Sequence, residues 1–129
     1  MSDQIITGAD FVSVPTRNLE ASVAFYGDML GLHRSVYVPE MGFAEFELGN
    51  VTLSVYSPDK VGIEFKPSGN AIALHVDDVA AARQTLSERG VTFFGDTIDT
   101  GVCHMGIFAD PEGNALMLHH RYAPRVTDD

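Results

Sequence analysis

The sequence contains a single cysteine, Cys103, among its 129 residues. One thiol cannot form a disulfide within the chain, so a disulfide framework is excluded. Disulfides persist mainly in secreted proteins, whereas thiols stay reduced in the cytosol. We therefore expect a cytoplasmic protein.

Long apolar runs are also missing. No stretch approaches the roughly 20 apolar residues that a membrane-spanning helix needs. The start of the chain, residues 1–7, lacks the basic residues and long apolar stretch of a signal peptide. The composition is 45% hydrophobic and 20% charged, without a low-complexity tract. This is typical of one globular domain with a real core.

Positive charge is scarce. Eight basic residues stand against 18 acidic ones, which gives a formal net charge of −10. Such a field repels phosphate backbones and anionic lipid, so nucleic acid and membranes are excluded as partners. The same field attracts cations, which is compatible with a cationic ligand. It is equally compatible with a surface that only keeps the protein in solution.

The first half of the chain has the pattern β-α-β-β-β. Residues 11–16 form the first expected strand, and Asn18 then offers an N-cap for a helix that ends at Gly31. Three further strands are expected at residues 32–38, 43–48 and 51–56.

The second half repeats this order. A strand at 71–76 precedes a helix that Asp77 or Asp78 caps and Gly90 ends. Three strands then follow, at residues 91–94, 102–109 and 115–120, with a tight turn at 110–114 between the last two. The sequence thus predicts an α+β fold of two βαβββ modules, about residues 9–56 and 71–122, joined by a linker at 57–70.

Three stretches, residues 18–32, 71–78 and 110–114, resemble the corresponding parts of the vicinal oxygen chelate superfamily. This family includes glyoxalase I, the bleomycin-resistance proteins and the extradiol dioxygenases. The resemblance runs from about Asp10 to His120. It implies that the modules form a curled mixed sheet around a cavity, commonly completed in a homodimer.

Enzymes of this family hold a divalent metal with His, Glu or Gln side chains at four strand positions. By the resemblance, these positions fall here on Phe11, on Ser54 (or Leu53), on Ala71 and on Met117. Phenylalanine and alanine donate no lone pair, serine is a poor ligand, and a thioether suits Cu(I). We therefore expect no metal and no other cofactor.

Aromatic and methionine side chains in the predicted strands indicate a pocket for a small, flat organic molecule. The alternative is that these side chains only fill the core. The predicted ligand-binding residues are four aromatics (Phe11, Tyr37, Phe43 and Tyr56), two methionines (Met105 and Met117), and Ser54, His75 and His119.

Two of these residues, His75 and His119, are also the candidates for acid–base catalysis. The leading hypothesis is an antibiotic-resistance type of binding protein that sequesters a cationic or aromatic compound without a metal. The alternative is a lyase or isomerase of the glyoxalase type, or a dioxygenase-related enzyme, with a displaced metal site or histidine catalysis. A third reading is a structural domain whose cavity is filled by its own side chains.

Overall fold

The computed structural model describes residues 3–125 of the chain. Its first module contains one helix and a four-stranded mixed sheet in the order β1-β4-β3-β2. Strand β1 runs parallel to β4, and the other pairs are antiparallel. The elements are β1 (Phe11–Pro15), α1 (Leu19–Ala24) with a π-helical continuation (Phe25–Met29), β2 (His33–Val38), β3 (Phe43–Glu47) and β4 (Thr52–Tyr56).

The second module has the same plan, with the sheet order β5-β8-β7-β6. Again the first strand of the module runs parallel to the last, here β5 to β8. Its elements are β5 (Ile72–His75), α2 (Val79–Glu88), β6 (Ile98–Asp99), β7 (Cys103–Ala109) and β8 (Ala115–Arg121). The predicted α+β fold of two βαβββ modules is confirmed.

Both helices begin at the predicted caps. The Asn18 side chain accepts a hydrogen bond from the Ala21 N–H, and the Asp78 side chain accepts one from the Ala81 N–H. These bonds satisfy N–H groups that the first turn of a helix leaves unpaired. Gly31 and Gly90 follow the two helices with φ angles of +74° and +102°, a region in which a side chain is strained.

One predicted strand, residues 91–94, is wrong. Val91 belongs to the buried core, and only Phe93 makes an isolated bridge, to Phe108. The edge strand of this sheet is instead the two-residue β6, whose Ile98 pairs with Met105. The run at 91–94 therefore contributes a buried Val91 and one local contact with β7, in which Phe93 bridges Phe108 and the Phe94 N–H donates to the Ile107 carbonyl, but it forms no continuous strand.

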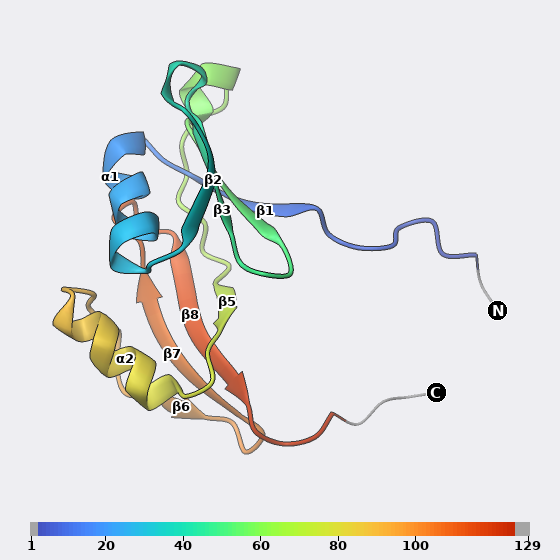
Figure 1. Cartoon of the computed structure of the whole chain (residues 1–129), viewed down its shortest axis with the longest axis vertical. Coiled ribbons are helices and arrows are strands. Elements are labelled where there is room, and N and C mark those ends of the chain that lie inside the picture. Colours follow the sequence, from blue (N-terminus) through green and yellow to red (C-terminus); the bar gives the residue numbers. More distant parts are fainter. Residues whose placement is uncertain (1–2, 126–129) are drawn as a thin grey trace.

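Two short 3₁₀ helices lie in connecting segments, at Pro39–Met41 and at Pro58–Val61. The second belongs to the connection between β4 and β5, which joins the two modules. Residues 3–10 precede β1, have no regular structure and are all exposed. They run away from the body of the molecule, on the side opposite to α1 and α2 (Figure 1). We call this segment the N-terminal arm.

A buried hydrogen-bond network joins the two modules. The Tyr26 hydroxyl, after α1, donates to Asp110 Oδ2 over 2.6 Å. The Asn114 side-chain amide donates to the same carboxylate and to the Pro15 carbonyl, and its oxygen accepts from the Ser68 N–H. Tyr26 and Asn114 are completely buried. Because buried polar groups need partners, this network fixes how the β7–β8 turn sits against the first module.

No helix within residues 3–125 combines the length and the apolar character that crossing a bilayer requires.

Candidate functional site

The first sheet has one covered face and one open face. Side chains at alternate positions, such as Ala44, Phe46, Leu53 and Val55, are completely buried on the side that α1 covers. The intervening side chains point the other way, because successive residues of a strand alternate between faces. We call this second side the first open face; it carries Phe11, Ser13, Phe43, Glu45, Ser54 and Tyr56.

Strand pairing brings the aromatic and polar residues of the first open face together. Phe43 is paired with Tyr56, and Glu45 with Ser54, across β3 and β4. Directly opposed residues of antiparallel strands have Cβ atoms about 4.5–5.5 Å apart, so each pair can contact one ligand. Phe11 on β1 is 58% exposed, a large value for a phenylalanine in a strand.

A hydrogen-bonded carboxylate stands at the end of this face. Glu47 accepts hydrogen bonds from the Ser35 hydroxyl at 2.5 Å and from the Thr52 hydroxyl at 2.8 Å. The Ser35 bond, then the Thr52 bond, hold the pKa of Glu47 below its usual range, and His33 nearby adds a smaller lowering effect. The carboxylate is therefore ionised at neutral pH.

The second sheet also has an open face. Leu116, Leu118, Gly106 and Phe108 are buried on its helix side. The intervening positions form the second open face, on which strand pairing aligns thioethers, imidazoles and small apolar groups. Met117 is paired with both Ala73 and Ile107, and His119 with both His75 and Met105.

The two candidate catalytic histidines are neighbours along the strands, but the His75 ring has other contacts. The His75 side chain is 72% exposed, and its Nε2 lies 3.3 Å from Asp77 Oδ1. Its ring centroid is 6.0 Å from that of His120. His75 belongs to the edge strand β5, where a side chain is open to solvent. His75 and His119 therefore do not form a pair that is shielded from water, as a site for proton transfer would need.

Eight of the nine predicted ligand-binding residues thus lie on the two open faces, and one does not. Tyr37 on β2 is paired with the buried Ala44 and lies on the covered side of the first sheet. The Arg34 guanidinium stands 4.5 Å from its ring centroid, a cation–π contact. Tyr37 is therefore separated from Phe43 and Tyr56 by the sheet itself.

The four positions that the resemblance assigns to metal binding carry side chains that do not suit a metal. Phe11 and Ser54 are on the first sheet, whereas Ala71 and Met117 belong to the second module. None of these side chains is a usual ligand of Zn, Ni, Mn or Fe(II). Within residues 3–125, no group of three or more His, Cys, Asp or Glu side chains is arranged to hold an ion.

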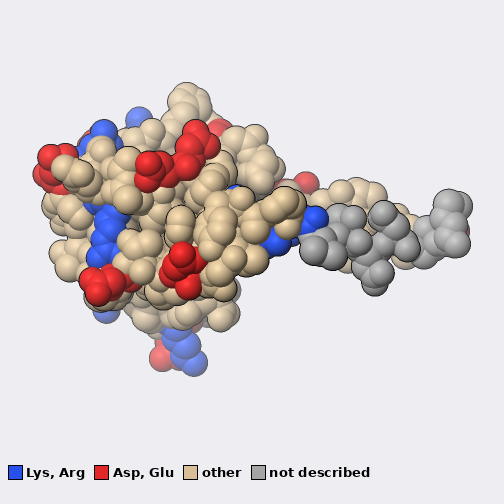
Figure 2. Space-filling view, turned by 90° about the horizontal axis from the view of Figure 1, so that it is seen from below, with Lys and Arg blue, Asp and Glu red and all other residues tan. Residues whose placement is uncertain are grey.

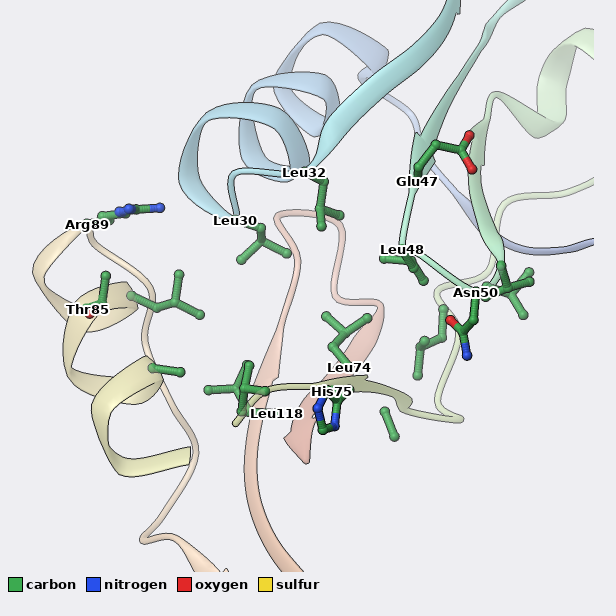
Figure 3. A pocket seen from close by; sticks show the side chains of 17 residues that line it. Leu30, Leu32, Glu47, Leu48, Asn50, Leu74, His75, Thr85, Arg89 and Leu118 are labelled. Carbon is green, nitrogen blue, oxygen red and sulfur yellow. The ribbon is translucent and has the colours of Figure 1, made fainter. Parts of the chain in front are cut away.

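A cavity that the sequence did not indicate lies where the two modules meet. Its volume is about 660 Å³, and it is bordered by β1, β5, α2, the β3–β4 turn and the residues after α1. Six leucines line it: Leu30, Leu32, Leu48, Leu74, Leu86 and Leu118. Thr85 and Arg89 lie at one end, and Glu47 and Asn50 at the other (Figure 3). We call this cavity the junction groove.

The junction groove is distinct from the predicted site. Of the nine predicted ligand-binding residues, only His75 borders it. Its leucines come from five separate segments of the chain, so no local spacing could have identified it. The sequence signal at this place is that two leucines, Leu30 and Leu32, flank the helix-ending Gly31. In the structure both are only partly buried.

Charge is spread over the surface. Figure 2 shows carboxylates at several separate places on one side of the molecule, with uncharged residues between them. The net charge of −10 is therefore a property of the whole chain, not of a single acidic patch on this side.

Comparison with known proteins gives one family. Residues 8–118 match the profile of the Glyoxalase/Bleomycin resistance protein/Dioxygenase superfamily. No curated protein matches the sequence.

Solved structures with the same fold come from proteins of different kinds. A protein described as a glyoxalase family member from Bacillus anthracis is 22% identical, with a TM-score of 0.79 over 93% of this chain and 99% of its own. TnmS3, an antibiotic binding protein from Streptomyces sp. CB03234, is 24% identical, with a TM-score of 0.77 over 92% and 99%. Lactoylglutathione lyase from Agrobacterium tumefaciens is 17% identical, with a TM-score of 0.75 over 88% and 93%. At sequence identities this low, the structural similarity establishes only that these proteins share a fold with this chain. With its profile match over most of its length, the chain belongs to the Glyoxalase/Bleomycin resistance protein/Dioxygenase superfamily.

Proposed function

We propose that this protein binds a small, flat, cationic organic molecule on its open sheet faces, without a metal, and sequesters it unchanged. The observation that carries the proposal is the placement of Phe11, Phe43 and Tyr56 on one uncovered face of the first sheet. In a chain that only filled its core with aromatics, these rings would lie on the covered side, beside Phe46.

The charge of the first open face favours a cation. Glu45 stands next to the Phe43–Tyr56 pair, and Glu47 is held ionised by Ser35 and Thr52. None of the residues that form this face is a lysine or an arginine. Aromatic faces attract cations through the ring quadrupole, and a nearby carboxylate adds Coulombic attraction.

The second open face would supply the other wall of the site. Its methionines, Met105 and Met117, are flexible and polarisable and adapt to different apolar shapes. The two sheets are not hydrogen-bonded to each other within residues 3–125, and Phe11 stays largely exposed in a single chain. A second copy of the chain that brings its own open face against the first would enclose the ligand. We therefore propose a homodimer as the binding form.

A binding role accounts for the site better than catalysis does. The four family metal positions carry no usual ligand, and His75 is exposed beside Asp77. A general acid or base needs a fixed position near the reacting atom, which an exposed ring on an edge strand lacks. TnmS3 is an antibiotic binding protein of the same fold, so the binding of a small organic molecule is a role this architecture can perform.

The proposal can be tested with two planar probes of opposite charge. The cation is 9-aminoacridine and the anion is 9-anthracenecarboxylate, and binding is measured by calorimetry. We expect the cation to bind at least 10-fold more tightly than the anion. Phe43→Ala and Tyr56→Ala should each weaken binding of the cation about 5- to 100-fold, since each removes one aromatic contact.

Tyr37→Ala is the matched control, because it removes an aromatic ring from the other side of the same sheet. It should leave the affinity unchanged within about twofold. Equal losses for Tyr37→Ala and Tyr56→Ala, or preference for the anion, would contradict the proposed site.

A further inference from the structure

The junction groove leaves apolar surface uncovered on the helix side of the second sheet. Leu86 and Leu118 line it and belong to the buried core. Leu30, Leu32 and Leu74 line it too and are only partly buried, although leucine is usually a core residue. The volume of about 660 Å³ is within the range of small-molecule sites. The groove is therefore large enough, and apolar enough, for a small organic molecule.

Helix α2 gives the groove an elongated shape. Its contributions are Ala82, Thr85, Leu86 and Arg89, at the spacing i, i+3, i+4 and i+7 that places side chains on one face of a helix. Seven residues of helix rise by roughly 10 Å. A chain-like molecule that lies along this face therefore reaches from Ala82 to Arg89.

The charged groups at the two ends of the groove differ in their hydrogen bonding. Among the described residues that line it, Arg89 is the only lysine or arginine and Glu47 the only aspartate or glutamate. Both oxygens of Glu47 already accept hydrogen bonds, from Ser35 and Thr52. Figure 3 shows this carboxylate pointing away from the leucines.

Arg89 can bind a further group. One of its N–H groups donates to the Met29 carbonyl over 2.9 Å, which holds the guanidinium between the end of α2 and the residues after α1. A guanidinium has five N–H donors in a planar fork that suits a carboxylate. The end of the groove at Arg89 is therefore the end that can take an anion.

We infer that the junction groove is a second binding site, which takes an aliphatic carboxylate with its alkyl chain along the leucines and its carboxylate on Arg89. The negative charge of Glu47 at the opposite end repels the carboxylate and thereby fixes the orientation of the molecule. This inference goes beyond the proposed function, because the groove lies apart from the open sheet faces and takes a molecule of opposite charge.

The first test uses three probes in calorimetry: decanoate, octanoate and decylammonium. We expect decanoate to bind with a dissociation constant below about 1 mM. Octanoate should bind roughly 10-fold more weakly, because it buries two fewer CH₂ groups. Decylammonium, with the same chain and the opposite charge, should bind at least about 10-fold more weakly than decanoate. Absence of decanoate binding, or equal affinities for decanoate and decylammonium, would overturn the inference.

The second test removes the anion-binding group. Arg89→Gln should weaken decanoate binding about 5- to 30-fold, and Arg89→Lys should restore most of the affinity. Arg83→Gln is the matched control, since Arg83 has the same charge on the same helix but contacts Phe93 and does not border the groove. Equal losses for Arg83→Gln and Arg89→Gln would show that only the net charge matters, and would overturn the site.

The third test fills the groove. Thr85 is exposed at the end of the groove near Arg89, so Thr85→Trp should fold normally and reduce decanoate binding at least about 10-fold. Gln84→Trp, at the neighbouring exposed position outside the groove, should bind decanoate like the wild type. Melting curves check that both variants are folded. Unchanged binding in Thr85→Trp contradicts the inference.

Two further measurements separate this site from other roles of the groove. Sedimentation with and without decanoate should give the same molecular mass. A change in mass would mean that the groove is an interface between copies, which overturns the inference. Arg89→Gln should bind 9-aminoacridine like the wild type, because Arg89 is not part of the open sheet faces. Failure of the carboxylate site and failure of the proposed cation site are thus distinguishable.

Discussion

The Tyr26 hydroxyl donates a 2.6 Å hydrogen bond to Oδ2 of Asp110, which lies 84 residues further along the chain. Both residues are buried, and the bond links the end of the first helical segment to the β7–β8 turn of the other module. Burial raises the pKa of the Tyr26 hydroxyl far above its ordinary value, and the Asp110 charge and hydrogen bond raise it further. Tyr26 therefore stays protonated and remains a donor throughout the accessible pH range.

Tyr26→Phe should destabilise the fold by about 1.5–3 kcal/mol, because it leaves a buried carboxylate with one donor fewer. Urea unfolding followed by circular dichroism measures the change. Tyr122→Phe is the control: its hydroxyl also donates to a carboxylate, that of Asp99, but both groups are exposed. The control should leave the stability nearly unchanged, because solvent screens an exposed interaction of this kind. Equal costs for the two variants would mean that the buried bond does not join the modules.

Asn114→Ala should cost more, roughly 2–4 kcal/mol in the free energy of unfolding. The Asn114 side chain bonds to Asp110, to the Pro15 carbonyl and to the Ser68 N–H, all in a fully buried position. Its loss leaves several buried polar groups without a partner. Asn50→Ala, at an exposed position, is the control and should be nearly neutral. A loss below about 1 kcal/mol for Asn114→Ala would contradict this account of the network.

Gly113→Val should lower the melting temperature. Gly113 has a φ of +89° in the β7–β8 turn, a region that costs a residue with a side chain about 1–2 kcal/mol. Beta-branching makes valine still less suitable there. Gly69→Val is the comparison, because Gly69 has no positive φ and no atom near its missing side chain. If both variants melt at the same temperature, the turn tolerates valine and its assignment is wrong.

Local signals in the sequence account for much of the fold. The caps Asn18 and Asp78 and the helix-ending Gly31 and Gly90 act within one turn of the backbone, so their spacing is legible in the chain. The strand predicted at residues 91–94 was wrong because a short apolar segment can equally pack without regular structure. Val91 does so here.

The site was harder to predict, for two physical reasons. A register shift between Arg34 and Val36 interrupts the alternation of β2, so the face of Tyr37 could not be read from spacing. The Tyr26–Asp110 bond and the junction groove join residues that are far apart in the chain. Such contacts depend on how the modules pack, which hydrophobic periodicity does not encode.

Glu47→Gln should reduce the loss of stability that the wild type shows as the pH falls from 6 to 3. Because hydrogen bonds lower the folded pKa of Glu47, its stabilising effect is present above the unfolded pKa of about 4.3. That effect is lost as the pH falls through the folded pKa. The difference in melting temperature between wild type and Glu47→Gln should therefore shrink between pH 6 and pH 3. Glu40→Gln serves as the control, since Glu40 is an exposed glutamate in the 3₁₀ helix Pro39–Met41. A difference that grows toward low pH would refute this role.

Native mass spectrometry of the protein as purified, without added metal, tests the central claim most directly. We predict a dimer without a stoichiometric divalent ion, which carries a small organic mass or takes up 9-aminoacridine. Removal of bound mass by desalting should leave the dimer able to bind the cation again. A protein that holds one divalent ion per chain would contradict a metal-free binding site. It would place the chain among the metal-dependent members of the superfamily.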